Sequence, residues 1–546
     1  MPIQRKRRVI ILGMAVWAVG GIAGVPAVAQ PNQPYPPIKW VARERLHQHA
    51  EAHDEGVDIA YWNERAGPAC EVHVAHWVYV TGWVTEMSGG VPIGTRFATY
   101  KYDATHPGPQ APIPDKFAYY PRQGDPFITG DTYKAVAMAV DSHDGSVYVV
   151  GQGPRVPGAT DQDYHLVKYD LELNVEWSRT YNGPVSGNDI PADVAIGLSG
   201  CSAPAAYVII TGTSPGAGTG QDITTVAYTT DGELAVQEWP TGLGQAEPGV
   251  RRYNHEGVSG DDRAVELGRV IVAVHQTPPF APILSVVVLG TSWGGETFDD
   301  MVTLAWSGPD PTWPTNWVRR YHLYRNDVAM GLADNGILYA VGHSEVPPPA
   351  TLMGQGGPNV SQDLDVDITT LSYFPDGVER WSVQHDFLQD VDIPRDIEVS
   401  VDGSSLTHIW IGGWTINPAT NEAELATLLY TEPPFSGVPV WSRRLSLGAD
   451  AQYAVRLTPR GGDAMWLTGA WVDSPRDSML TLKFTDPPAP AGPSWYRTYT
   501  VGGFDEGRGI LSLRIEEPLT NHSIFITGTS STAGQGRDFV TLRYRE

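Results

Sequence analysis

The sequence predicts an all-β protein in which one four-stranded unit recurs eight times. A short apolar strand that ends in glycine is the most regular element, and its glycines are Gly82, Gly151, Gly212, Gly290, Gly342, Gly412, Gly469 and Gly528. Apolar and polar residues alternate in and around these segments, as half-buried strands require. Pairs such as Asp144-Gly145 and Asn335-Gly336 suit tight hairpin turns. No convincing amphipathic helix follows residue 29.

Four strands can be recognised in each unit, and we call them a to d. Strand a opens with an acidic residue, strand b ends in the glycine, strand c often reads D-x-x-T-x-x-aromatic as at Asp222, and strand d carries a tryptophan such as Trp177 or Trp239. The tryptophan markers recur about every 65 residues between Trp40 and Trp495. Four strands in a period of this length, repeated eight times, predict an eight-bladed β-propeller of four-stranded antiparallel blades.

The two ends of the chain predict how the ring closes. The first strand, at Trp40, is of type d, and the last, at Tyr544, is of type c. The N-terminal strand would therefore complete the last blade and leave no free sheet edge. We expect residues 30–546 to form this single propeller.

The N-terminus predicts export. Arg5 to Arg8 are basic, residues 9–25 are apolar, and Ala27-Val28-Ala29 precedes Gln30 as a small-residue cleavage site. This pattern is typical of a secretory signal peptide over residues 1–29, with a membrane anchor as the alternative. We therefore expect a secreted or periplasmic protein with no stable membrane span after cleavage.

The charge balance limits the partners. Asp and Glu (62) outnumber Lys and Arg (37), and removal of residues 1–29 with their four basic side chains changes the formal net charge from −25 to −29. This composition argues against nucleic-acid binding and favours cationic partners. The two cysteines, Cys70 and Cys201, lie in non-adjacent units, so we do not expect a disulfide.

The stretch DSHDGSVYVVG…DYHLVKYDLELNVEWSRTYNG resembles the SBBP-type secreted bacterial β-propeller repeats and the similar delta-60 repeats. The resemblance covers residues 37–546. It implies the propeller fold but no common activity, because such repeats have no shared function. The strand-d tryptophans are also distantly similar to the docking tryptophans of eight-bladed quinoprotein dehydrogenases.

An aspartate opens strand a in every unit. The eight are Asp54, Asp131, Asp189, Asp262, Asp327, Asp392, Asp450 and Asp505. If strand a is innermost, they surround the mouth of the central channel on the face that carries the d–a and b–c connections. They would either bind a cation or a positively charged ligand there, or accept backbone N–H groups at the strand entry.

Two further groups predict metal sites, each with an ordinary polar loop as the alternative. His47, His49 and His53 lie together in the first d–a connection and could share a transition metal. Asp363, Asp365 and Asp367 alternate along an extended b–c connection and suit calcium. No other cofactor is indicated.

Four tryptophans follow the strand-b glycines and are expected to open the b–c loops. They are Trp83, Trp293, Trp414 and Trp471. Exposed indole rings beside carboxylates suit stacking on sugar rings, and capping of the blade ends is the alternative. The leading prediction is an exported binding protein for an extracellular glycan or envelope component on this face. The alternative is an enzyme at the channel mouth, either a polysaccharide lyase or hydrolase or a metal- or quinone-dependent oxidoreductase.

Overall fold

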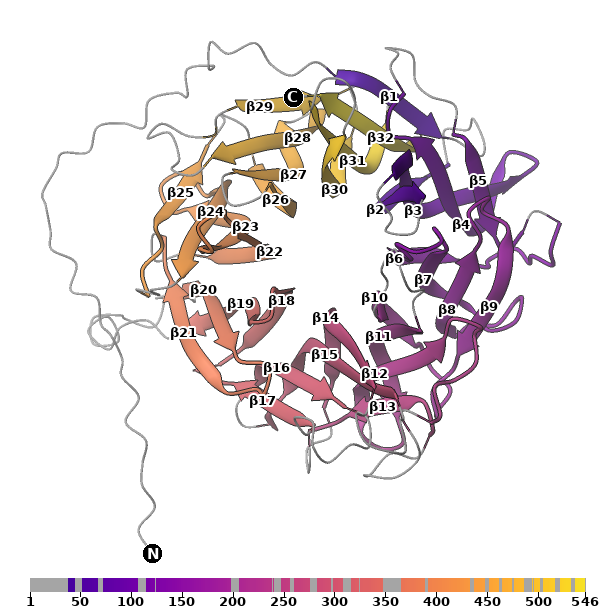
Figure 1. Ribbon diagram of the computed structural model, residues 1–546, viewed down its shortest axis with the longest axis horizontal. Helices are drawn as coiled ribbons and strands as arrows, with labels where there is room; N and C mark the ends of the chain where they lie inside the picture. Colours follow the sequence, from indigo (N-terminus) through magenta and orange to yellow (C-terminus); the bar gives the residue numbers. More distant parts are fainter. Residues whose placement is uncertain are drawn as a thin grey trace, which may run out of the picture.

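The structure, a computed structural model, is a closed ring of β-sheets (Figure 1). It describes residues 38–44, 52–66, 72–106, 114–122, 124–197, 206–237, 239, 247–255, 260–274, 282–295, 298–307, 316–323, 325–346, 365–387, 391–432, 437–446, 451–460, 464–473, 476–485, 493, 495–500, 504–515, 521–531 and 536–545. The predicted signal peptide, Cys70 and Cys201 lie outside these residues. No helix among the described residues is long and apolar enough to cross a membrane.

The first four blades follow one another in chain order. Blade 1 contains β2 Glu55–Ala66, β3 Val72–Ser88, β4 Val91–Asp103 and β5 Lys116–Tyr120; blade 2 contains β6 Lys134–Val140, β7 Val147–Pro154, β8 Gln162–Tyr169 and β9 Val175–Tyr181; blade 3 contains β10 Ile190–Gly197, β11 Tyr207–Gly216, β12 Gly220–Thr229 and β13 Val250–Tyr253; blade 4 contains β14 Asp262–Val274, β15 Pro282–Trp293, β16 Asp299–Trp306 and β17 Trp317–Tyr321.

The remaining four blades complete the ring. Blade 5 contains β18 Asp327–Asp334, β19 Leu338–Val346, β20 Asp365–Tyr373 and β21 Glu379–His385; blade 6 contains β22 Asp392–Val401, β23 Thr407–Asn417, β24 Glu422–Glu432 and β25 Trp441–Leu445; blade 7 contains β26 Ala451–Arg460, β27 Ala464–Asp473, β28 Arg476–Thr485 and β29 Trp495–Tyr499; blade 8 contains β30 Asp505–Ile515, β31 Asn521–Ser531, β32 Arg537–Arg545 and β1 Ile38–Glu44. The predicted eight-bladed propeller is confirmed.

Strand a is the innermost strand of every blade, and these strands surround the central opening in Figure 1 (β2, β6, β10, β14, β18, β22, β26 and β30). The core lies between neighbouring blades. Val150 of blade 2, for example, shares a fully buried cluster with Val208 and Ile210 of blade 3. Burying both faces of each sheet in this way explains why strands b and c are almost continuously apolar.

The ring closes as the sequence predicts. Strand β1 pairs antiparallel with β32, from Ile38 opposite Tyr544 to Glu44 opposite Phe539. The Arg43 guanidinium of β1 also donates a hydrogen bond of 2.6 Å to the hydroxyl of Tyr499 in blade 7. The N-terminal strand therefore covers the edge of β32 and connects blade 8 to its neighbour.

The glycine of strand b has a structural cause, although the strand continues beyond it. Strand a contains a bulge in every blade, as between Gly56 and Asp58 in blade 1, and its carbonyl groups approach strand b closely there. A Cβ atom at Gly82 would lie 1.8 Å from Glu55 O, and one at Gly151 would lie 2.2 Å from Lys134 O. Only glycine fits such an approach. In blade 6 this residue is Gly413, opposite Pro394, so the assignment of Gly412 is corrected.

Most tryptophan markers belong to the core as expected. Trp317 and Trp441 of strand d are 7% and 5% exposed. Trp239 is fully buried but does not lie in strand d, because that strand of blade 3 is β13, Val250–Tyr253. The long connection between β12 and β13 places Trp239 in a turn that packs against blade 4.

Candidate functional site

The aspartates that open strand a are turned into the blades. The seven described members, all except Asp450, are at most 3% exposed. Asp131 accepts backbone N–H groups from Ile128 at 2.9 Å and Gly158 at 2.8 Å. Asp327 accepts the N–H of Leu323 at 2.8 Å. These bonds hold the d–a connections and, through Gly158, a b–c connection against the start of strand a. This is the structural role that the sequence analysis gave as the alternative to ligand binding. A ligand-binding role for these residues stays a prediction.

The four tryptophans lie within strand b rather than in the b–c loops, which corrects their expected position. Trp83 and Trp414 directly follow the glycine at the bulge, whereas Trp471 and Trp293 follow it by two and three residues. All four are partly buried. The Lys134 ammonium lies 4.6 Å from the centre of the Trp83 ring, so a side chain of blade 2 covers that ring. Stacking of a ligand on these rings stays a prediction.

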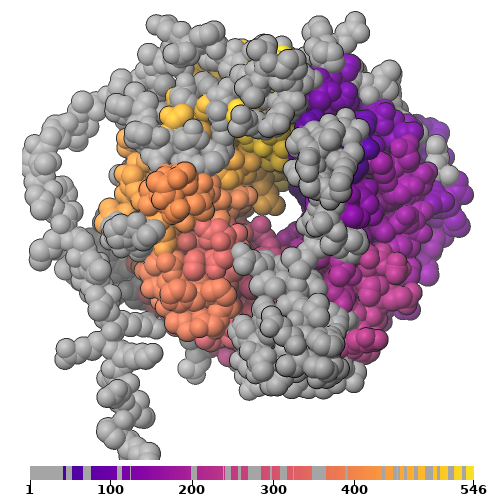
Figure 2. Space-filling model, viewed as in Figure 1, coloured from indigo at the N-terminus to yellow at the C-terminus, as the bar shows by residue number. Residues whose placement is uncertain are grey.

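The bulges of strand a place one residue from each blade at the same level of the channel. We call these residues the channel belt: Asp58, Ala137, Asp193, Glu266, Gly331, Asp396, Arg456 and Gly509. Figure 2 shows the opening at the centre of the ring. Four of the eight belt residues are acidic and one is basic.

The belt carboxylates join neighbouring blades. Each accepts a backbone N–H from strand a of the next blade: Asp58 from Met138 at 2.9 Å, Asp193 from Leu267 at 2.9 Å, Glu266 from Leu332 at 2.7 Å and Asp396 from Leu457 at 2.7 Å. Strand a is an edge strand with unpaired N–H groups, so these bonds satisfy donors that the sheet cannot.

Arg456 interacts with the belt from blade 7. Its Nη1 lies 3.5 Å from Asp396 Oδ1, and its side chain is 52% exposed. The charge of Asp396, followed by those of Glu266, Asp58 and Asp193, raises the pKa of Arg456 above its ordinary value. These carboxylates come from four other blades, and the central channel is the space that adjoins all of them.

Two acidic residues near Arg456 have pKa values above their ordinary range. Burial raises the pKa of Asp193 to about 6. Burial and then the neighbouring Asp396 carboxylate raise the pKa of Glu398 to about 8. Asp396 and Glu398 are two residues apart on β22 and therefore share one face of the strand. A protonated carboxyl beside an ionised one is an arrangement that supports general acid catalysis.

The predicted metal ligands are partly described. His47, His49 and Asp363 lie outside the described residues, and His53 is exposed with its backbone N–H bonded to Thr85 Oγ1 at 2.8 Å. Asp365 and Asp367 do come together, and Asp386 of the following d–a connection joins them. A second group, Asp300, His322 and Asp327, contains a carboxylate already paired with Arg320 at 2.6 Å.

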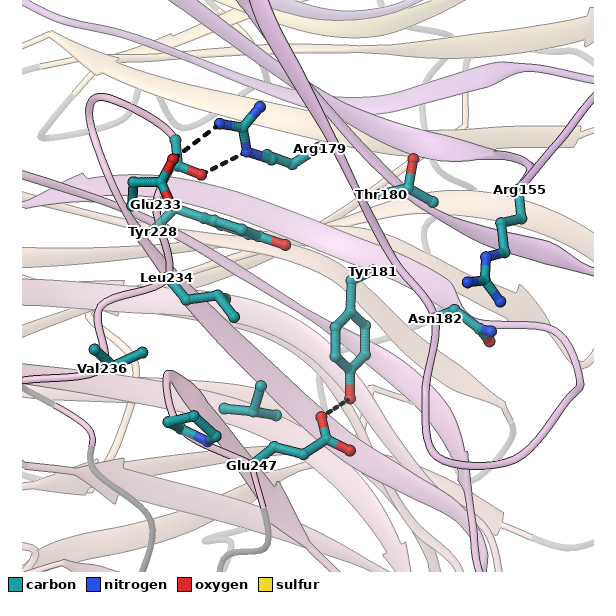
Figure 3. A pocket seen from close by; sticks show the side chains of 13 residues that line it. Arg155, Arg179, Thr180, Tyr181, Asn182, Tyr228, Glu233, Leu234, Val236 and Glu247 are labelled. Atoms are coloured by element: carbon teal, nitrogen blue, oxygen red, sulfur yellow. Dashed lines mark hydrogen bonds and ion pairs between the residues drawn. The ribbon is translucent and has the colours of Figure 1, made fainter.

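A hollow of about 800 Å³ lies at the outer rim between blades 2 and 3 (Figure 3). We call it the rim groove. Its apolar wall contains Leu234 and Val236, which are 38% and 44% exposed, and its polar wall includes Arg155 and Asn182. Tyr181 stands between these walls and donates a hydrogen bond of 3.4 Å to Glu247.

The groove also contains an ion pair. Arg179 Nη2 lies 3.4 Å from Glu233 Oε1, and Arg179 Nε donates to Gly232 O at 2.6 Å. The groove therefore offers hydrogen-bond donors and acceptors beside exposed aliphatic carbon. Its walls come from the β7–β8 connection, the end of strand β9 and the β12–β13 connection. The repeat pattern did not indicate the groove, because the β12–β13 connection is longer than the c–d connections of the other blades.

No protein-family model and no curated protein matches the chain, so the resemblance to SBBP-type repeats stays a prediction. Several solved structures are similar to the chain, at low identity and low TM-score. Sqt1 from Chaetomium thermophilum is 10% identical over 91% of this chain and 98% of that chain, with a TM-score of 0.42. The α-L-arabinofuranosidase Arb93A from Fusarium graminearum is 10% identical over 75% and 92%, with a TM-score of 0.32. A PL25 ulvan lyase is 9% identical over 74% and 95%, with a TM-score of 0.35. At these levels of similarity, nothing about ligand or activity follows.

Proposed function

We propose that the protein is an exported binding protein and that its ligand is an extracellular glycan or another envelope component. The rim groove is the observation that carries this proposal. A sugar presents C–H faces beside hydroxyl groups, and the groove offers exposed Leu234 and Val236 beside the polar groups of Arg155, Asn182 and Glu247. The basic and apolar N-terminal sequence supports export.

A glycan array with the mature chain tests this function. Arg155→Gln and Val236→Asp change exposed groove residues, so the fold should tolerate both. We expect each to weaken binding of a retained glycan by about tenfold, because each alters one contact worth about 1–2 kcal/mol.

Lys116→Gln is the matched control, since it removes an exposed positive charge from the outer strand of blade 1. Trp83→Ala and Trp414→Ala test the alternative site on the face that carries the b–c loops. Absence of binding to any glycan would refute the proposal. If the tryptophan variants lost binding while both groove variants kept wild-type affinity, the binding site would lie on the b–c loop face and not in the rim groove.

A polysaccharide-cleaving enzyme is the second candidate, and the perturbed acids of the channel support it. Glu398, with its pKa raised to about 8, would donate a proton to a leaving group, and Arg456 would bind a developing anion. Incubation with a panel of polysaccharides, followed by detection of new chain ends, tests this activity. Cleavage that survives Glu398→Gln would exclude this mechanism.

A further inference from the structure

An acid–arginine pair recurs at one position of the blades. The acidic residue that opens strand c is paired with an arginine of strand d in blades 3, 4 and 6. The pairs are Asp222 with Arg252 at 3.1 Å, Asp300 with Arg320 at 2.6 Å, and Glu424 with Arg444 at 2.6 Å. The guanidinium neutralises a carboxylate that is almost completely buried.

Blade 5 breaks this pattern. Strand pairing sets Thr369 opposite Gln384, as it sets Val302 opposite Arg320 in blade 4. Gln384 therefore stands where blades 3, 4 and 6 have arginine. Two residues later, Asp386 stands where blade 4 has His322. Compared with blade 4, blade 5 therefore has no arginine at this position and has an additional carboxylate beside it.

The carboxylates of blade 5 are close enough to share one ion. Oxygen atoms of Asp365, Asp367 and Asp386 all lie within 4.8 Å of one another. Asp367 is only 8% exposed, and its Oδ1 has no hydrogen-bond partner among the described residues.

Blade 2 provides an internal comparison. Its strand-c acid, Asp163, also lacks an arginine, because Thr180 stands at that position. Asp163 is fully buried, but among the described residues it belongs to no group of three ligand atoms. A missing arginine alone therefore does not create the arrangement of blade 5.

We propose that Asp365, Asp367 and Asp386 bind one calcium ion, which replaces the arginine of the sibling blades. Carboxylate oxygens are the ligands that calcium prefers, and water and backbone carbonyls can complete its six to eight ligands. Asp386 is exposed and gives the ion a route from solvent. The ion would join the start of β20 to the connection between blades 5 and 6, where Val366 already forms a bridge with Val391.

Calorimetric titration of the EDTA-treated full chain with calcium chloride tests the site. We expect one calcium ion per chain and a melting temperature that rises by about 2–4 °C in excess calcium. Asp386→Asn changes an exposed side chain and should fold normally, yet weaken calcium binding by about tenfold or more because it removes one charged ligand. Asp367→Asn should do the same, and Asp163→Asn is the matched control that should keep wild-type affinity.

Gln384→Arg provides a second test that does not depend on loss of structure. It recreates the pair of blades 3, 4 and 6, so the variant should melt at or above the temperature of the calcium-free wild type and no longer respond to calcium. Absence of calcium binding in the wild type would overturn the proposal. Unchanged calcium affinity in both Asp386→Asn and Gln384→Arg would also overturn it, because the ion would then bind elsewhere.

Discussion

Replacement of Gly151, the glycine of strand β7 that faces the bulge of β6, tests the blade geometry quantitatively. A Cβ at Gly151 would lie 2.2 Å from Lys134 O and 2.5 Å from Phe97 Cζ, whereas real Cβ atoms keep at least 3.0 Å. The carbonyl would have to retreat by about 1 Å, and strand β6, which lines the channel, would move with it. Overpacking of this kind lowers the free energy of unfolding by about 1–3 kcal/mol. Alanine also reduces the conformational entropy of the unfolded chain, which raises the free energy of unfolding by about 0.4–1 kcal/mol. The Cβ would meet backbone atoms as well as a side chain, so the upper part of the overpacking range applies, and we expect Gly151→Ala to destabilise the protein by about 2 kcal/mol.

Scanning calorimetry of Gly151→Ala measures this effect. A loss of about 2 kcal/mol in a ring of this size lowers the melting temperature by about 2–4 °C. Gly403→Ala is the matched control, because that glycine lies in an exposed turn and a Cβ there would meet no atom within 4 Å. Equal melting temperatures for the two variants would refute the proposed reason for the glycine.

Three further predictions concern charge and closure. Asp163 is fully buried and burial raises its pKa to about 7, so its contribution to stability is present below about pH 4 and is lost as the pH rises to 7. Asp163→Asn should therefore stabilise the protein by about 2 kcal/mol more at pH 8 than at pH 5 in thermal melts, and an equal effect at both pH values would contradict this. Arg252→Met leaves Asp222 buried without its partner and should cost about 3 kcal/mol or more in chemical denaturation; a cost below about 1 kcal/mol would contradict this. Deletion of residues 1–44 exposes the edge of β32 and should produce lower melting temperatures and larger assemblies in size-exclusion chromatography, whereas a stable monomer would show that closure by β1 is dispensable.

The repeat pattern predicted the propeller because the blade imposes the same local requirements eight times. The glycine of strand b, the aspartate of strand a and the apolar strands b and c each satisfy one such requirement. Predictions from the repeat were wrong where a blade departs from the repeat. Trp239 was assigned to strand d because the long connection in blade 3 cannot be distinguished from a strand by composition. Trp83, Trp293, Trp414 and Trp471 were assigned to the b–c loops because strand b was expected to end at its glycine, whereas it continues three to six residues beyond it.

The candidate sites depended on contacts that sequence spacing does not contain. Asp365 and Asp367 could be paired by their alternation along one strand, but Asp386 comes from the next connection and meets them only through strand pairing. If the strand-d sequences of the blades had been aligned with one another, they would have shown that blade 5 has Gln384 where blades 3, 4 and 6 have arginine. The rim groove and the reach of Arg456 toward Asp396 required the packing of whole blades.

The sequence by itself determined the eightfold repeat, the order of strands and the closure by the N-terminal strand, because each depends on residues close together in the chain or on its two ends. Only the tertiary structure decided which carboxylates are buried, which are paired and which face one another. Those properties arise where strands far apart in the sequence meet, both within one blade, as in the pair of Asp222 and Arg252, and between blades. The number of residues between two such side chains carries no information about the distance between them.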